Sequence, residues 1–118
     1  MATRTPTTQF LTSGRDVIKF VWSGLLNGDS GGAVEFNSYP DRSIQVNGTF
    51  GAGGSVLLEG SNNGEVSYST LNKTTDGTAM TITAGSLLGV LELAAQTRPR
   101  VTAGDGTTSL TVTMIARR

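Results

Sequence analysis

The residues of this chain that could do chemistry are mostly carboxylates. The 118-residue sequence contains no histidine and no cysteine. Their absence excludes the Ser-His-Asp and Cys-His nucleophile systems and the usual zinc sites. A pair of carboxylates could still act as the acid and base of a glycosidase. The nine acidic residues are Asp16, Asp29, Glu35, Asp41, Glu59, Glu65, Asp76, Glu92 and Asp105.

Most of these carboxylates lie in turns or beside a glycine. Asp29, Asp76 and Asp105 stand where aspartate stabilises a turn through its own side chain. Calcium is the metal that such loop oxygens could bind, but no loop clusters three acidic residues, and Asp29-Ser-Gly-Gly lacks EF-hand spacing. We therefore predict turn aspartates, and we expect no enzymatic activity and no catalytic residue, cofactor or metal site.

Positive charge is concentrated at Arg98, Arg100, Arg117 and Arg118. These arginines could be ordinary solvated side chains, or they could contact nucleic acid or an anionic patch on a partner protein. The nine basic residues only balance the nine acidic ones, whereas a nucleic-acid binder needs a basic excess. Few aromatic residues accompany the arginines, so the stacking expected of a single-strand binder is missing. We expect no direct contact with nucleic acid.

Two other motifs have a structural and a functional interpretation. Trp22 and Tyr68 could form a sugar-binding platform, although a single tryptophan on a strand more often belongs to the core. The glycine-rich run Gly51-Ala-Gly-Gly54 lacks the Gly-Lys-Ser/Thr of a phosphate-binding loop. We interpret it as a hairpin turn.

The composition indicates one small domain without disulfide bonds or a membrane-spanning segment. Charged residues make up 15% of the chain, well below the roughly 25% of an average soluble domain. A chain with few charges and no net charge is prone to associate, which favours an oligomer or a component of an assembly. No apolar run is long enough to span a membrane, and residues 1–9 lack the apolar centre of a secretion signal. We expect folding in a cytoplasm and no membrane contact.

The elements that position these side chains are short strands separated by turns. Residues 1–16 are polar and threonine-rich, and they predict an extended N-terminal arm that packs either on a neighbouring subunit or on its own domain. Residues 17–118 are expected to form the domain itself. In the first strand, residues 17–23, both faces carry apolar side chains, so this strand is either central in its sheet or covered by a partner.

Several further strands follow from the alternation of apolar and polar residues. We expect a strand over residues 42–50, paired as a hairpin with residues 55–59 across the turn at 51–54. Gly48 falls on the apolar face of this strand and marks a bulge or a close contact. The other expected strands cover residues 33–36, 65–71, 78–83, 90–93, 98–102 and 110–114, with a turn at 60–64. Pro99 places its strand at a sheet edge or its own start.

This pattern of eight or nine strands without a long helix predicts an all-β fold. The expected architecture is an antiparallel β-sandwich or jelly-roll-like single domain with an extended N-terminal arm.

Two glycine- and threonine-rich runs carry a resemblance to a known family. They are Arg42-Ser-Ile-Gln-Val-Asn-Gly-Thr-Phe-Gly-Ala-Gly-Gly-Ser-Val-Leu-Leu-Glu-Gly-Ser-Asn-Asn-Gly64 and Arg98-Pro-Arg-Val-Thr-Ala-Gly-Asp-Gly-Thr-Thr-Ser-Leu-Thr-Val-Thr-Met114. Both resemble small virion proteins of tailed bacteriophages, the head decoration or cement proteins, over about residues 17–116. Residues 60–64 also resemble a segment of carbohydrate-binding jelly rolls in which an aromatic residue often follows; here Tyr68 stands in that region.

The resemblance implies a structural virion protein on the outer capsid surface. Such a protein binds the major capsid protein, commonly as a homotrimer, and clamps neighbouring capsid subunits. Two other functions stay open: another phage structural module, such as a tail, fibre or head-fibre base, or a carbohydrate-binding β-sandwich.

Overall fold

Two β-sheets packed face to face make up the whole molecule. The computed structural model describes residues 1–118, and it is all-β, without a helix. The strands are β1 (Thr3–Arg4), β2 (Thr7–Phe10), β3 (Val17–Leu25), β4 (Ser30–Gly31), β5 (Asp41–Thr49), β6 (Ser55–Ser61), β7 (Ser69–Thr70), β8 (Thr81–Ile82), β9 (Ser86–Gly89), β10 (Gln96–Ala103) and β11 (Ser109–Arg117). No helix that could cross a membrane is present.

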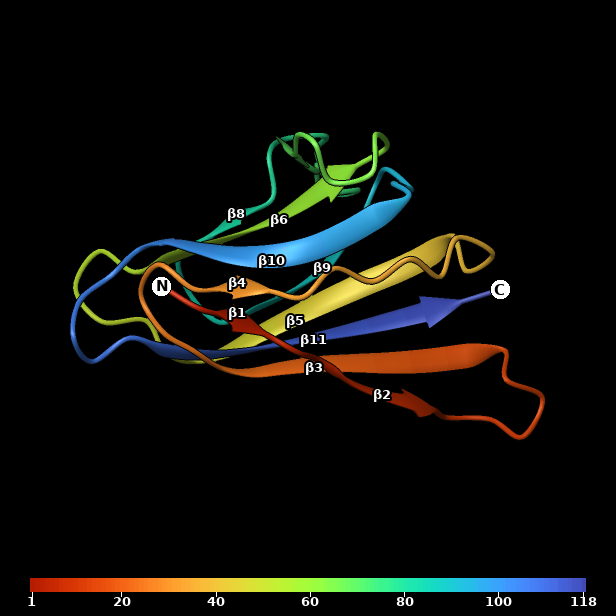
Figure 1. The fold of residues 1–118 in the computed structure, drawn as a ribbon, viewed down its shortest axis with the longest axis horizontal. Coiled ribbons are helices and arrows are strands. Elements are labelled where there is room, and N and C mark those ends of the chain that lie inside the picture. Colours follow the sequence, from red (N-terminus) through yellow and green to blue (C-terminus); the bar gives the residue numbers. More distant parts are fainter.

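Each sheet is named here after its long strand from the C-terminal part of the chain. The β10 sheet has the order β1-β4-β10-β6-β7, and β8 also pairs with β6. The β11 sheet has the order β2-β3-β11-β5-β9. Figure 1 shows β6, β8 and β10 forming one layer and β3, β5 and β11 the other. Every strand pair is antiparallel except β1 with β4, so the expected antiparallel sandwich is confirmed.

Strand alternation builds the core between the two sheets. The β3 residues Ile18, Phe20 and Trp22 are fully buried, as are Leu110, Val112, Met114 and Ala116 of β11. The β10 sheet contributes Val56, Leu58 and Val101. Because β3 lies between β2 and β11, it is central in its sheet, which is one of the two explanations given above for its two apolar faces.

The predicted hairpin between residues 42–50 and 55–59 is wrong. β5 pairs with β11 on one side and β9 on the other, whereas β6 pairs with β10, β7 and β8. Both edges of β5 are therefore occupied, and the chain crosses to the other sheet at residues 51–54. There Asp105 Oδ2 accepts a hydrogen bond from Ala52 N at 2.9 Å, and the Thr108 hydroxyl donates to Phe50 O. Two distant turns are thereby joined at one end of the sandwich.

Four other expectations about strands need correction. Of residues 65–71, only Ser69–Thr70 form a strand, β7, because the chain bends and turns over residues 62–67. Residues 33–36 form no strand: only Val34 makes an isolated bridge, with Thr97. The strand predicted at 90–93 lies at 86–89 instead, and Val90 makes a single bridge with Lys73. The turn predicted to begin at Gly60 begins later, because β6 continues to Ser61. A side chain at Gly60 would meet Ala94 Cβ at 2.5 Å, so this glycine marks a close packing contact rather than a turn.

Gly48 and Pro99 occupy sites that match their chemistry. A Cβ on Gly48 would lie 2.5 Å from the carbonyl oxygen of Ser109, so Gly48 marks the close contact that was one of its two interpretations. The prediction for Pro99 is wrong on both counts, because Pro99 lies inside β10, away from the start of the strand, and β10 lies between β4 and β6 in its sheet. On the side of β10 opposite β6, the pairs are Arg100 with Ser30 and Thr97 with Val34. Pro99 lies between these pairs, where its missing N–H removes no ladder bond.

Residues 1–16 pack on their own domain and contact both sheets. β1 pairs with β4 in the β10 sheet, and β2 pairs with β3 in the β11 sheet. Asp29 is 2% exposed and its carboxylate accepts hydrogen bonds from Ala2 N at 2.8 Å and Arg4 Nε at 2.9 Å. The arm could pack on a neighbouring subunit or on its own domain, and in the structure it packs on its own domain.

Candidate binding site

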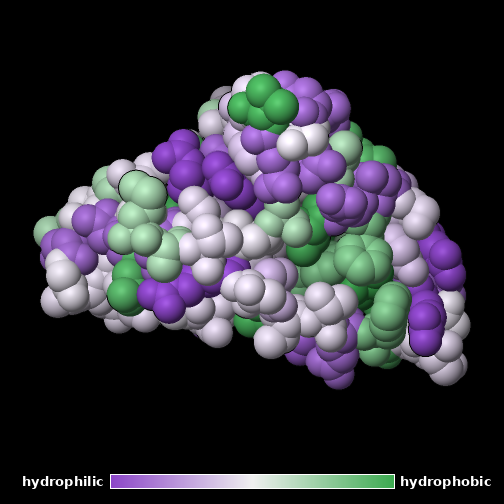
Figure 2. Space-filling view, viewed as in Figure 1, coloured by the Kyte–Doolittle hydropathy of each residue, from purple (hydrophilic) through white to green (hydrophobic).

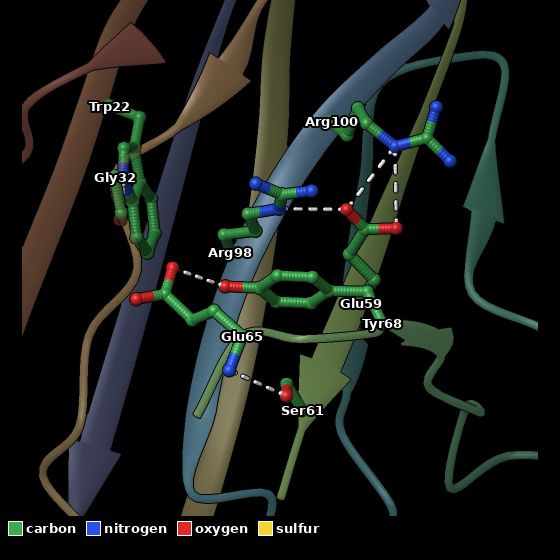
Figure 3. A network of polar contacts seen from close by, with 8 residues as sticks. All are labelled: Trp22, Gly32, Glu59, Ser61, Glu65, Tyr68, Arg98 and Arg100. Carbon is green, nitrogen blue, oxygen red and sulfur yellow. Dashed lines mark hydrogen bonds and ion pairs between the residues drawn. The ribbon is translucent and has the colours of Figure 1, made fainter. Parts of the chain in front are cut away.

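A cluster of two arginines around one carboxylate lies on the outer face of the β10 sheet. The alternation of β10 places Arg98 and Arg100 on this face, while Thr97, Pro99 and Val101 face the core. Glu59 of β6 lies opposite Arg98 in the strand register. Glu59 Oε1 accepts a hydrogen bond from Arg98 Nε at 2.8 Å and from Arg100 Nε at 3.2 Å (Figure 3). The carboxylate therefore neutralises part of the charge of both arginines.

Tyr68 stacks against this cluster and fixes Arg98 from the other side. The guanidinium carbon of Arg98 lies 3.8 Å from the centre of the Tyr68 ring, a cation–π contact. The Tyr68 hydroxyl donates a hydrogen bond to Glu65 Oε1 at 2.7 Å (Figure 3). Burial, followed by the hydrogen bond to Glu65, raises the pKa of Tyr68 well above its usual value. The phenol thus remains a neutral donor. We name Glu59, Tyr68, Arg98 and Arg100 the arginine site.

The arginine site borders a shallow hollow of about 760 Å³. One wall is the segment 65–68, and the other is the N-terminal segment 1–3. Val66 in the first wall is 83% exposed, and Met1 in the second is also exposed. The hollow thus combines two guanidinium groups and exposed apolar side chains on one face.

A second hollow, of about 450 Å³, adjoins the first, and most of the residues that line it are polar. Residues 61–63 and 92–94 contribute to its lining, and Ser67 lines both hollows. Glu92 Oε1 accepts a hydrogen bond from Asn72 N at 2.7 Å, and Oε2 accepts one from the Asn72 side chain at 2.6 Å. The bond from the Asn72 backbone is the main reason why the pKa of Glu92 is lowered. Glu92 therefore fixes the loop at Asn72.

The three aspartates predicted in turns bind turn groups, as expected. Burial by itself would raise the pKa of Asp29, but hydrogen bonds from Leu26 N, the Arg4 side chain and Ala2 N outweigh it and lower the pKa. The Thr78 hydroxyl and N–H lower the pKa of Asp76. The Thr107 hydroxyl, together with Ala52 N and Thr107 N, lowers the pKa of Asp105 to about 2.

No three acidic side chains converge on one point anywhere in the chain. Asp16 and Asp41 pair with Arg118 and Arg117 at the C-terminal end of β11, far in sequence from Glu59. The four arginines considered together in the sequence therefore form two separate pairs. Arg98 and Arg100 share one carboxylate and border the same hollow, whereas Arg117 and Arg118 bind different carboxylates.

The two aromatic residues considered as a sugar platform are not equivalent. Trp22 is fully buried, and its Nε1 donates a hydrogen bond to the carbonyl oxygen of Gly32 at 2.9 Å. It therefore has no exposed face on which a sugar could stack. Tyr68 is half-buried, and one face of its ring is covered by Arg98.

Sequence reasoning did not find Glu59 and Glu65 as members of this site. The pairing of β6 with β10 brings Glu59 to Arg98 across 39 residues of sequence. In the sequence, Glu59 is an isolated acidic residue between Leu58 and Gly60, but the sequence does not show which strand pairs with β6.

Arg42 was also missed as a structural residue. It is 3% exposed and donates hydrogen bonds from Nε to Tyr39 O at 2.9 Å and from Nη2 to Phe36 O at 2.7 Å. It fixes the loop that follows β4.

The outer face of the β11 sheet is the second surface of functional interest. Its half-buried or exposed side chains are Val17, Lys19, Val21, Ser43, Gln45, Thr111, Thr113 and Ile115. Leu87 of the edge strand β9 is 67% exposed and lines a shallow hollow of about 480 Å³ with Val17 and Ile115. We name these nine residues the β11 outer face. It is partly apolar and carries one charged side chain, Lys19, and the ion pair of Arg117 with Asp41 lines the same hollow at its border.

A third surface lies where the arm passes the segment after β4. A hollow of about 600 Å³ there is lined by Thr5, Pro6, Thr8, Ala33, Val34, Glu35 and Phe36. Phe36 is 39% exposed although its ring also contacts Phe20. In the space-filling view, apolar residues gather beside the segment that connects β4 to β5 (Figure 2). We name this surface the arm-side hollow.

Comparison with known proteins finds likeness in fold only. No family model and no curated protein matches the sequence. The solved structure of the SPBc2 prophage-derived protein YomS is similar with a TM-score of 0.64 and 10% sequence identity, over 86% of this chain and 95% of YomS. The two chains thus share a fold across nearly their whole lengths.

Two further structures are less similar. A Cupin 2 conserved barrel domain protein from Salinispora arenicola CNS-205 has a TM-score of 0.49 at 10% identity, over 96% of this chain and 72% of that protein. KdgF from Halomonas sp. has a TM-score of 0.46 at 13% identity, over 96% of this chain and 77% of that protein.

Proposed function

We propose that this chain is a structural virion protein that decorates the outer surface of a phage capsid and clamps neighbouring major capsid subunits. The observation that carries the proposal is the β11 outer face, a surface of four strands (β3, β11, β5 and β9) with Lys19 as its one charged side chain and with apolar side chains at Val17, Leu87 and Ile115. A surface of this kind suits burial against another protein rather than binding of a small substrate.

Two further observations support a phage origin. The sequence resembles decoration proteins of tailed phages over about residues 17–116, and the chain shares its fold with a prophage-derived protein. A small domain that binds only the assembled shell stabilises the shell by mass action. Many copies with modest affinity could therefore act together.

We propose that the protein is a homotrimer and that its subunits meet at the arm-side hollow. All four residues of the edge strand β2 are exposed, and an exposed edge can pair with a neighbouring chain. Beside it the arm-side hollow offers the apolar side chains of Pro6 and Phe36. The arm is thus a rigid part of the subunit surface, because Asp29 binds it to its own domain.

Sedimentation with capsids tests this function. Capsids assembled from the major capsid protein of the same phage or prophage are incubated with the protein and pelleted, and bound copies are located by electron microscopy. Leu87→Lys places a charge on the β11 outer face, at its edge strand β9, without disturbing the core, because Leu87 is 67% exposed. We expect this variant to bind at least about tenfold more weakly, which corresponds to about 1.4 kcal/mol.

The matched control is Leu26→Lys, which alters another exposed leucine, 45% exposed, at the end of β3. It should bind capsids like the unaltered protein. Density on the tail or on fibres would replace the capsid function with another virion role. The absence of the protein from particles, with no sedimentation, would overturn the proposal.

A further inference from the structure

The arginine site has hydrogen-bond donors that nothing in the chain uses. Both arginines bind Glu59 through Nε only, and the terminal Nη atoms of Arg98 and Arg100 make no hydrogen bond within the protein. A guanidinium presents these terminal N–H groups as a planar fork whose geometry matches a carboxylate. The side chains of Arg98 and Arg100 are 26% and 42% exposed, so both forks are accessible to a ligand.

The negative and positive charges of the arginine site lie at different depths below the surface. The side chain of Glu59 is only 4% exposed and lies beneath the arginines. A ligand that approaches from solvent therefore meets the positive guanidinium groups first. Because the Tyr68 ring holds Arg98 at 3.8 Å and Glu59 holds both Nε atoms, the forks are fixed before any ligand binds. A fixed site loses little side-chain entropy on binding.

The surroundings select the kind of anion. The charges of Arg98 and Arg100 are balanced by Glu59 and Glu65, and Glu65 lies at the rim on the Tyr68 hydroxyl. A polyanion such as a nucleic acid would meet Glu65 and gain little, whereas one carboxylate can reach a single fork. Val66 and Met1 in the two walls offer apolar contacts on either side of it.

We propose that the arginine site binds a single side-chain carboxylate from a segment of a partner protein, with apolar residues next to the acid contacting Val66 and Met1. This inference goes beyond the proposed function, since it requires no capsid. It also assigns an interaction to the β10 sheet, on the opposite side of the sandwich from the β11 outer face.

Nuclear magnetic resonance of the intact chain tests the proposal. The probe is a pentapeptide blocked at both ends, with a central glutamate between two leucines. We expect the Nε–Hε signals of Arg98 and Arg100 to shift saturably with the peptide concentration. Arg100→Gln leaves the pair of Arg98 with Glu59 in place, and it should weaken binding about fivefold, in the range of partly exposed ion pairs. Arg117→Gln, at the pair with Asp41 on the other sheet, is the matched control and should bind normally.

Several outcomes would overturn the proposal. A peptide with glutamine in place of its glutamate must bind at least about fivefold more weakly, and equal binding would mean that the carboxylate is not recognised. Tighter binding of trigalacturonate or inorganic phosphate would assign the site to an acidic sugar or a phosphate instead. No shift at either arginine would leave the site a structural ion pair. None of these results bears on sedimentation with capsids, so the two proposals fail separately.

Discussion

At the scale of single residues, polar side chains in this protein mainly fix turns and loops. Asp29 binds the arm, Asp105 joins two turns, Glu92 holds Asn72, and Arg42 holds the loop after β4. Each of these groups forms hydrogen bonds with backbone donors or acceptors of a turn, a loop or the arm. Chains with short strands and long connections need many such contacts, because the backbone N–H and C=O groups of the connections have no strand partners.

Asp29→Asn tests how firmly the arm is held. The neutral amide cannot form an ion pair with Arg4, and its NH2 group would face the N–H donors that the carboxylate oxygen now accepts. We therefore expect a loss of about 1–3 kcal/mol in the free energy of unfolding. The pKa of Asp29 is lowered in the folded protein from 3.8. Its contribution is therefore complete above that value and is lost as the pH falls through the lower folded pKa.

Urea unfolding of both proteins between about pH 7 and about pH 2 measures this difference. The gap in stability should be constant above about pH 5 and should shrink in strong acid. Asp76→Asn, in an exposed turn, is the control and should change stability less. Equal stabilities of Asp29→Asn and the unaltered protein at neutral pH would contradict the assigned role.

At the scale of elements, the register between strands decides what lies on each face. β6 pairs with β10 over residues 55–61 and 96–103, and this pairing brings Glu59 to Arg98 and Arg100. A slip by one residue would turn Glu59 toward the core. Gly60, next in β6, lets Leu71 and Ala94 pack against the strand on the opposite face.

Gly60→Ala tests this packing at the element. The added Cβ would lie 2.5 Å from Ala94 Cβ and 2.9 Å from Leu71 Cδ2. Overpacking of this kind costs about 1–3 kcal/mol, which thermal unfolding would show as a lower midpoint. Gly106→Ala is the matched control, because a Cβ there meets nothing within 4 Å. An unchanged midpoint for Gly60→Ala would mean that β6 moves easily at this point.

At the scale of the whole molecule, three surfaces face away from the core. They are the arginine site, the β11 outer face and the arm-side hollow, and they lie on different sides of the sandwich. A small domain with several interaction surfaces can bind copies of itself and another protein at once. This division of surfaces is the physical basis of the proposed role in an assembly.

Light scattering coupled to gel filtration tests the proposed trimer. We expect a mass of three times 12.2 kDa. Thr8→Lys adds a charge in the arm-side hollow, where Thr8 is exposed, and should shift the protein toward single subunits because a buried unpaired charge opposes association. Thr75→Lys, on the exposed loop after β7, is the control and should stay trimeric. A mass of 12.2 kDa at every concentration would exclude a stable trimer.

The sequence by itself determined the all-β class, the apolar side chains on both faces of β3, the alternation of β11 and the turn aspartates, because each depends on neighbours within a few residues. Only the tertiary structure decided that β5 and β6 lie in different sheets, that the arm packs on its own domain, and that Glu59 joins Arg98 and Arg100. The reason is that strand pairing is a long-range choice. The alternation of a strand states which face is buried, but it does not state which partner supplies the hydrogen bonds.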